Sequence, residues 1–328
     1  MQAFVTGATG FLGRRIVRRL VERGDTVLAL ARESSDTGYL EGLGAQIVKG
    51  DLADVDAFVD QVSGCDVVFH AGARVATHGD WEEFFVANVE ATQKLIDAAS
   101  AAGARFVHVS SLGIFEIDRA GIVVTEETDY DHNPMLRGFY TRSKIDADRV
   151  ACAAARTGKD VVVVRPGRLN GFDHPQGEPV FLGRVKKFFG ADTLVVVSTP
   201  GYHVPTVHVE NAADAVVSAG LTADVGGEIF NVIDDPEMTQ REYFRRLSEA
   251  RGTKLRVLFI PVALFTPAVK AVDMLHRLVK RRPWTIAYQL LRSELDARYP
   301  TDRAQEKLGW KPALEVTEGL RVSIAPDA

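Results

Sequence analysis

Short apolar runs alternate with amphipathic stretches through the first half of the chain. Uninterrupted β-branched runs suit strands that are buried on both faces of a sheet, and helices between parallel strands make the crossovers. This alternation predicts an α/β fold built on a doubly wound parallel sheet. The helical periodicity is clearest at Phe11–Arg23 and Phe85–Ala102. The expected strands are Ala3–Val5, Thr26–Ala31, Ala45–Val48, Asp66–Phe69, Arg105–Val109 and Val161–Val164.

The alternation stops after Pro166. Residues 167–205 are rich in Gly, Pro and aromatic residues, residues 238–251 form a charged helical pattern, and residues 255–300 mix apolar and basic side chains. One more strand is expected at Ile229–Ile233, after the chain returns to the sheet near His208–Leu221. We therefore predict a sheet domain of residues 1–166, with 207–235 returning to it. Residues 167–206 and 236–328 are expected to form a small substrate-binding region.

Composition narrows the class of protein. The chain has 328 residues, 46% hydrophobic and 25% charged, which excludes a disordered or collagenous protein. Its net charge of −5 provides no general attraction for nucleic acid, so no nucleic-acid partner is expected.

Cysteine usage and hydropathy indicate the compartment. Cys65 and Cys152 lack metal-ligand spacing, which favours buried, reduced thiols in a cytoplasmic protein without a metal. No charged leader precedes the first strand. The longest uncharged apolar run, Val257–Val269, is too short and too interrupted by proline to span a bilayer, so no transmembrane segment is expected.

Three glycines mark the junction between the first strand and the first helix. Gly7, Gly10 and Gly13 have the spacing G-x-x-G-x-x-G. Such glycines permit a tight turn, close approach of a pyrophosphate and close packing of helix on strand. The following helix N-terminus offers free N–H donors to phosphate. With a strand before it and a helix after it, this turn predicts a dinucleotide site.

The end of the second expected strand bears on which dinucleotide binds. Arg32 lies where a carboxylate would bind the ribose hydroxyl of NAD, and its cation suits the 2′-phosphate of NADP. A solvent-exposed surface arginine is the alternative, and the nearby Glu33 and Asp36 leave NAD open. Asp51-Leu52 follows the third strand, where a side chain can reach adenine; Asp51 could equally be a helix N-cap.

Candidate catalytic residues occur as two further motifs. Tyr140 and Lys144 are four positions apart, so on a helix they share one face, and a nearby ammonium lowers the pKa of a phenol. Such a tyrosine can exchange a proton with a carbonyl or alcohol oxygen. Ser110 and Ser111 end the fifth strand, at the edge of the sheet where such folds bind ligands. A surface pair and a turn serine are the structural alternatives.

These motifs together resemble the extended short-chain dehydrogenase/reductase family, over nearly the whole chain. This family has a Rossmann sheet and a small C-terminal substrate domain, in agreement with the pattern above. The matching segments are Thr6-Gly-Ala-Thr-Gly-Phe-Leu-Gly13, Gly50-Asp-Leu52, His70-Ala-Gly-Ala73, Asn88-Val-Glu-Ala-Thr92, Val109-Ser-Ser111, Tyr140-Thr-Arg-Ser-Lys144, Arg165-Pro-Gly167, Val207-His-Val-Glu-Asn211 and Leu308-Gly-Trp310.

The resemblance implies roles for individual residues. Tyr140 is the acid/base, Lys144 lowers its pKa and holds the nicotinamide ribose, and Ser111 polarises the substrate oxygen. Ser111 is preferred to Ser110 because it lies four positions before an aromatic residue, although that residue is Phe115 where the family usually has tyrosine. Asn88 is expected to brace the central helix and strand. The implied cofactor-binding residues are Gly7, Thr9, Gly10, Phe11, Leu12, Gly13, Arg32, Asp51, Leu52, Ala71, Gly72, Ala73, Asn88, Tyr140, Lys144, Pro166 and Gly167.

Departures from other branches of the family favour an oxidoreductase. Leu112-Gly113 stands where dehydratases carry an acidic pair, and Arg168 stands where nucleotide-sugar enzymes usually carry asparagine. Residues 73–84 resemble the 3β-hydroxysteroid dehydrogenase-like and dihydroflavonol reductase-like branch. Two apolar clusters suit a hydrophobic substrate or simply close the core of the small region. Their members are Phe181, Leu182, Val185, Phe188 and Phe189, and Leu258, Phe259, Ile260, Leu264 and Phe265.

The resulting hypothesis is an NADP(H)-dependent oxidoreductase that interconverts a secondary alcohol and a ketone on a hydrophobic small molecule. A nucleotide-sugar 4-epimerase with tightly bound NAD is the alternative, and a dinucleotide-sensing protein without activity ranks last. His70, His108 and His208 are interpreted as packed structural histidines.

Two expectations concern partners. The resemblance implies a homodimer through the helices Phe85–Ala102 and Tyr140–Thr157. Residues 270–282 form a basic, amphipathic stretch that allows peripheral contact with an anionic membrane, although a solvated face is the preferred interpretation.

Overall fold

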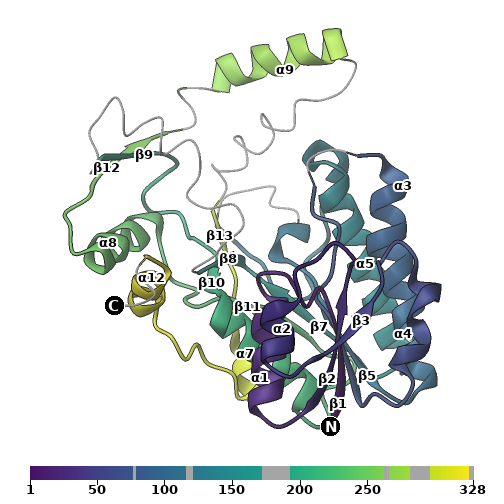
Figure 1. Cartoon of the computed structure of the whole chain (residues 1–328). Coiled ribbons are helices and arrows are strands. Elements are labelled where there is room, and N and C mark those ends of the chain that lie inside the picture. The colour runs from purple at the N-terminus through teal and green to yellow at the C-terminus, as the bar shows by residue number, and fades with distance from the viewer. Residues whose placement is uncertain are drawn as a thin grey trace.

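The centre of the fold is a seven-stranded parallel sheet, seen in a computed structural model (Figure 1). The structure describes residues 1–76, 79–115, 121–171, 193–261, 264, 266–280 and 296–324. The strand order is β11-β7-β5-β4-β1-β2-β3 and every neighbouring pair is parallel. The strands are β1 Gln2–Thr6, β2 Thr26–Ala31, β3 Gln46–Lys49, β4 Val67–His70, β5 Arg105–Val109, β7 Val161–Pro166 and β11 Ile229–Val232. The predicted α/β class and doubly wound parallel sheet are confirmed.

Helices cover both faces of this sheet, and the alternation of side chains along β1 shows why. Ala3 and Val5 pack into the core under α1 (Gly13–Glu22) and α7 (Val209–Leu221), while Phe4 packs into the core on the other face. That second layer is formed by α4 (Ala91–Ala101) and α5 (Phe139–Arg156). Both faces of each central strand are therefore buried, which explains the uninterrupted apolar runs.

The expected single helix at Phe85–Ala102 is divided in the structure. It begins earlier with α3 (Trp81–Phe84), continues through the π-helical turn η3 (Phe85–Glu90) and ends with α4. The side chains of Asp80 and Glu83 form a capping box at its start. Apolar periodicity cannot reveal a π turn, because a π turn adds one residue without removing the apolar face.

Short strand pairs and helices form the remainder of the described chain. Each short pair joins segments that are distant in sequence, so the alternation of the first half gave no sign of them. The pairs are β8 (Arg168–Asn170) with β10 (Thr206–His208), β9 (Thr193–Val197) with β12 (Arg256–Ile260), and β6 (Ile122–Val123) with β13 (Ala297–Arg298). The helices are α2 (Gly38–Gly42), α8 (Gln240–Arg251), α9 (Thr266–Lys280), α11 (Asp302–Leu308) and α12 (Val316–Ile324). The 3₁₀ turns are η1 (Val55–Ala57), η2 (Val59–Val62), η4 (Leu112–Ile114) and η5 (Pro134–Arg137).

The structure places the return segment on the sheet, with α7 packed into the core and β11 paired to β7. The division of the chain into two domains stays a prediction. Of the two apolar clusters, the members at 181–189 and Phe265 lie outside the described residues. Leu258, Phe259 and Ile260 lie on β12, where the ring of Phe259 contacts that of Phe244 on α8.

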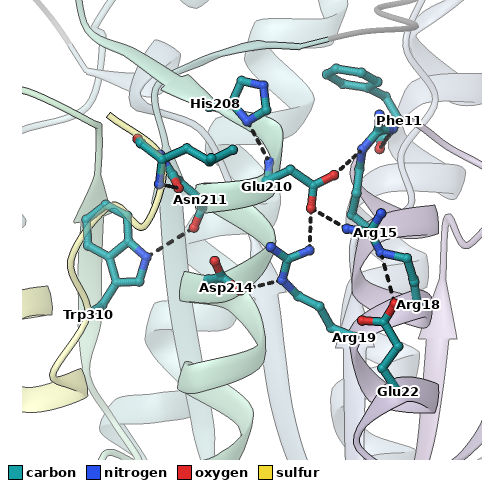
Figure 2. Close-up of polar contacts among 11 residues, drawn as sticks. Phe11, Arg15, Arg18, Arg19, Glu22, His208, Glu210, Asn211, Asp214 and Trp310 are labelled. Atoms are coloured by element: carbon teal, nitrogen blue, oxygen red, sulfur yellow. Dashed lines mark hydrogen bonds and ion pairs between the residues drawn. The ribbon is translucent and has the colours of Figure 1, made fainter. Parts of the chain in front are cut away.

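A group of charged side chains fastens α7 to α1 (Figure 2). The Glu210 carboxylate accepts from Arg15 Nε at 3.2 Å and from Arg18 Nη2 at 2.6 Å, and it also accepts from Arg19. Arg19 reaches Asp214 one turn further along α7. Arg15 Nη1 also donates to the carbonyl of Phe11 at 2.9 Å. These contacts fix the start of α1, and with it the glycine-rich turn, against the returning segment.

Candidate active site

A cleft of about 1120 Å³ opens at the carboxyl ends of the central strands. Its lining includes residues that directly follow β1, β2, β4 and β7, namely Gly7, Arg32, Ala71 and Gly167. The chain leaves β1 toward β2 on one side and later returns to β4 on the other, so this is the point where the strand order reverses. In open α/β sheets, ligands bind at such a switch point.

The glycine-rich turn forms one wall of this cleft. Gly7 has a φ of +67°, and a Cβ there would lie 2.6 Å from the backbone nitrogen of Gly72. A Cβ on Gly13 would lie 2.0 Å from the Gly7 carbonyl oxygen. Any side chain at either position would separate the turn from β4 or from α1. No side chain caps the first turn of α1, so its amides can meet a phosphate.

The outer end of the cleft carries Arg32. It lines the cleft together with Ser35 and Asp51, whereas Glu33 and Asp36 do not. The Asp36 carboxylate instead accepts from the amide of Gly38 at 3.0 Å. Neither of the two acids that complicated the cofactor prediction lines this end of the cleft.

Ser111, Tyr140 and Lys144 line the inner end of the same cleft. Ser111 Oγ accepts from the amide of Gly113 at 3.0 Å, which fixes the hydroxyl at the start of η4. Lys144 Nζ donates to the Val109 carbonyl at 2.7 Å, at the end of β5. Helix α5 and strand β5 thereby bring all three side chains to one place, although the serine is distant in sequence from the other two.

The pKa shifts of the two groups on α5 both reflect burial. Burial raises the pKa of Tyr140 and lowers the pKa of Lys144 to about 8. The predicted lowering of the Tyr140 pKa by Lys144 is wrong for this structure, because the ammonium is directed to a backbone carbonyl and desolvation of the phenol dominates. Tyr140 is therefore a protonated phenol near neutral pH, able to donate its proton.

Asn88 braces helix α5 through Ser143 but does not line the cleft. Its side chain is 2% exposed and is fully used by other partners. Asn88 Oδ1 accepts from the Arg74 amide at 2.6 Å, and Nδ2 donates to Ser143 Oγ at 2.8 Å. Ser143 in turn donates to the Tyr140 carbonyl at 2.8 Å. The prediction that Asn88 contacts the cofactor therefore has no support in this geometry.

A second chain of hydrogen bonds connects Asn88 to the segment next to the glycine-rich turn. Thr92 Oγ1 donates to the Asn88 carbonyl at 2.6 Å, so it must accept from His70 Nε2 at 3.0 Å. The other ring nitrogen of His70 then accepts from Thr6 Oγ1, 2.7 Å away, and Thr6 accepts from the Gly72 amide at 3.1 Å. Burial lowers the pKa of His70 to about 3, in agreement with a neutral ring.

Replacing Asn88 by alanine is expected to reduce the free energy of unfolding by about 2 kcal/mol, because it leaves buried partners on Arg74 and Ser143 unsatisfied. Chemical denaturation measures this change. Gln93→Ala is the matched control, since Gln93 is exposed and bonds to the exposed Asp97 on the same helix. Equal stability of the two variants would contradict the bracing role.

A buried ion pair joins α5 to strand β7. Asp148 and Arg165 are 0% and 1% exposed and form a two-point contact, Nη2 to Oδ2 at 2.6 Å and Nε to Oδ1 at 3.1 Å. Tyr130 Oη donates to the same carboxylate at 2.8 Å. Burial alone would raise the pKa of Asp148, but the charge and hydrogen bonds of Arg165 lower it to about 2. Asp148 lies one turn after Lys144, so the pair fixes the helix that carries the cleft residues.

The structure thus gathers nearly all predicted site residues around one cleft. All predicted catalytic residues line it, as do all predicted cofactor-binding residues except Asn88. The three predicted structural histidines are all buried. Cys65 and Cys152 are buried free thiols, as expected.

Several lining residues were not predicted. Arg74, Val75, Glu83, Val86 and Ala87 come from the segment between β4 and α4, and Ser110, Arg168 and Leu169 adjoin residues that were predicted. Arg74 and Glu83 form an ion pair of 3.1 Å. Their positions within residues 73–84, already noted for their resemblance, were the available signal.

Two absences hold for the described part of the chain. Within it, no helix is both long and apolar enough to cross a bilayer. The same residues contain no group of three or more His, Cys, Asp or Glu side chains arranged to hold a metal ion.

Comparison with known proteins places this cleft in context. The family model described as "NAD dependent epimerase/dehydratase family" matches residues 3–232. The 4-hydroxy-2-methyl-3-oxo-4-farnesyl-3,4-dihydroquinoline-1-oxide ketoreductase of Stigmatella aurantiaca is 30% identical over 98% of this chain and 95% of that one. The 2-alkyl-3-oxoalkanoate reductase of Shewanella oneidensis is 25% identical over 97% and 84%. The crystal structure of gox2253 matches the fold with a TM-score of 0.81, at 24% identity over 98% and 96% of the two chains.

Proposed function

Since the chain belongs to the NAD-dependent epimerase/dehydratase family, we propose that it is an oxidoreductase interconverting a secondary alcohol and a ketone on a hydrophobic small molecule. The observation that carries this proposal is the shared cleft. Ser111, Tyr140 and Lys144 line its inner end, and the glycine-rich turn and Arg32 line the rest. A dinucleotide laid on the turn would present its nicotinamide to the three side chains.

The residues of the cleft fit a nicotinamide dinucleotide. The wall at Gly7 and Gly72 is so close that a Cβ would fill it, and the open N-terminus of α1 faces the same space. The turn would hold the pyrophosphate, and Pro166 and Gly167 would adjoin the nicotinamide end. When bound, the cofactor supplies or accepts the hydride.

Each catalytic side chain has a separate task in the reduction direction. Ser111 Oγ already accepts from Gly113 N–H, so its O–H can donate a hydrogen bond that polarises the substrate carbonyl. Tyr140 delivers its phenolic proton to that oxygen as the alcohol forms. Lys144, with a pKa of about 8, carries a cation at the inner end of the cleft, where it would hold the ribose of the nicotinamide. In the oxidation direction the same proton returns to Tyr140.

Both relatives support a hydrophobic ketone as substrate. The names of the two reductases describe substrates with an oxo group together with an alkyl or farnesyl chain. In this chain Val75, Val86, Ala87 and Leu169 line the cleft and provide an apolar surface for such a chain. Leu112-Gly113 follow Ser111 where a dehydratase needs an acidic pair, so the proposal does not include loss of water.

The alternative, a nucleotide-sugar 4-epimerase, would use the cofactor differently. An epimerase oxidises and re-reduces its substrate, and so shows no net conversion of the dinucleotide. Stoichiometric consumption of NADPH or NADH with a hydrophobic ketone supports the proposed function. Tightly bound cofactor without net turnover would contradict it.

We propose NADP(H) as the preferred cofactor, because Arg32 and Ser35 line the outer cleft while Glu33 and Asp36 do not. Arg32→Ala is expected to weaken NADPH binding by about 10-fold or more, since it removes a charge-assisted contact to the 2′-phosphate. NADH binding should change by less than about 2-fold, because NADH lacks that phosphate. Fluorescence titration measures both constants.

Arg256→Ala on the exposed start of β12 is the matched control for charge removal. It should leave both affinities unchanged. A wild-type preference for NADH, or equal loss of both cofactors in Arg32→Ala, would refute the assignment.

A further inference from the structure

Helix α9 stands at the edge of the molecule, apart from the other labelled elements (Figure 1). Its sequence is strongly amphipathic. Ala271, Val272, Met274, Leu275 and Leu278 recur at intervals of three and four, so they share one side of the helix. We refer to these five residues as the apolar face of α9.

The apolar face is directed outward, the reverse of a helix that packs on a core. Val272 is 45% exposed, Met274 63%, Leu275 59% and Leu278 69%. On the opposite side, Val269 is buried and Asp273 and His276 are half-buried. The polar side therefore faces the protein and the apolar side faces the surroundings, an arrangement that marks an interaction site.

The charge of α9 is opposite to that of the whole chain. The helix contains Lys270, Arg277 and Lys280 against one carboxylate, Asp273, and the sequence continues with Arg281-Arg282. The chain as a whole has a net charge of −5. A basic helix with a broad apolar face is the combination that lies in the interface of an anionic membrane.

We propose that α9 docks on the surface of an anionic phospholipid bilayer. The apolar face enters the boundary between headgroups and acyl chains, and the exposed Lys270, one helical turn before Met274 at the border of that face, contacts lipid phosphates. The polar side of α9 remains against the protein, so the body of the enzyme lies above the membrane. A simply solvated face is the alternative expectation for this basic stretch.

A second copy of the chain fits this surface less well. Pairing two copies through this face would bring together two helices that each carry three basic residues and one acidic residue, and like charges repel. The apolar face has only four large side chains, fewer than a stable protein interface requires. An anionic bilayer satisfies both the apolar face and the charge.

Membrane docking does not depend on the proposed reaction. It is tested by binding alone, so failure of either proposal leaves the other standing. If both hold, a hydrophobic ketone dissolved in the bilayer would lie next to the enzyme that reduces it.

The test uses the full chain and vesicle flotation. Wild type is expected to float with vesicles of phosphatidylcholine and phosphatidylglycerol, and to bind pure phosphatidylcholine vesicles at least about 10-fold more weakly. Leu275→Glu combined with Leu278→Glu should reduce binding to the anionic vesicles by at least about 10-fold. Thermal unfolding of this variant should match wild type, because both leucines are already exposed.

Two further variants test the contribution of charge and provide a control. Lys270→Glu should weaken binding to anionic vesicles and leave the weak binding to neutral vesicles unchanged. Tyr39→Glu, an exposed aromatic residue on α2, should leave both unchanged.

Three outcomes would overturn the proposal. They are absence of vesicle binding by wild type, undiminished binding by the double variant, and a wild-type dimer that the double variant dissociates while neither protein binds vesicles. The last outcome would assign the apolar face to a second copy of the chain.

Discussion

Replacing Tyr140 by phenylalanine is expected to reduce kcat for ketone reduction by about 10³-fold. The change removes one hydroxyl, the only proton donor that the proposed mechanism assigns to the substrate oxygen. The aromatic ring remains, so the cleft keeps its shape. Steady-state consumption of NADPH with a hydrophobic ketone measures the effect.

Cofactor affinity separates this effect from loss of structure. The dissociation constant for NADPH should change by less than about 2-fold in Tyr140→Phe, because binding depends chiefly on the turn and on Arg32. Tyr39→Phe, on an exposed tyrosine outside the cleft, should retain full activity. Retention of more than about a tenth of wild-type kcat would overturn the assignment of Tyr140 as proton donor, since a general acid contributes at least 10²-fold.

Replacing Asp148 by asparagine is expected to lower the free energy of unfolding by about 3 kcal/mol. The substitution preserves size but leaves the Arg165 guanidinium buried without its counterion. Arg165 also lies 5.0 Å from the Phe115 ring and donates to the Glu126 carbonyl at 2.8 Å. Those contacts do not supply a negative charge. Urea or thermal denaturation measures the loss.

The pH dependence of this loss gives a second readout. The pKa of Asp148 is about 2 in the folded protein, and an unfolded aspartate has a pKa near 3.9. A depressed folded pKa means that the ion pair contributes fully above about pH 4 and loses its contribution as the pH falls toward 2. The difference in stability between wild type and Asp148→Asn should therefore shrink over that window.

An exposed ion pair provides the comparison. Asp97 accepts from Lys159 at 2.5 Å, but its side chain is 54% exposed. Asp97→Asn should cost less than about 1 kcal/mol at any pH, because solvent screens the pair. If Asp148→Asn were no more destabilising than Asp97→Asn, the buried pair would not be what holds α5.

Strands and the glycine-rich turn could be predicted from the sequence because their causes are local. Val161–Val164 can be satisfied only by burial on two faces, and β7 lies there in the sheet. The turn at Gly7 depends on sterics within a few residues. By contrast, β9 and β12 pair across more than fifty residues of intervening chain, so neither segment carries its partner in its own pattern.

The candidate site residues also divide into those with local causes and those that depend on distant segments. Tyr140 and Lys144 were found because helical spacing alone places them on one face. Asp148 continues that spacing by one more turn, yet it was not identified. The reason is that its role depends on Arg165, which reaches it from β7. The side-chain amide of Asn88 bonds to Arg74 and Ser143, which fits the expected bracing role, while its contact with the cofactor stays a prediction.

The sequence by itself determined the strand–turn–helix at the glycine-rich turn, the alternation that builds the sheet, and the placement of Tyr140 and Lys144 on one helix face. These depend on backbone sterics and on periodicity, which act between neighbours. Only the tertiary structure decided which groups share a cleft, that burial raises the pKa of Tyr140 and lowers that of Lys144, and that α9 turns its apolar face outward. Those properties depend on desolvation and on charges from distant segments, and both are set when the chain packs.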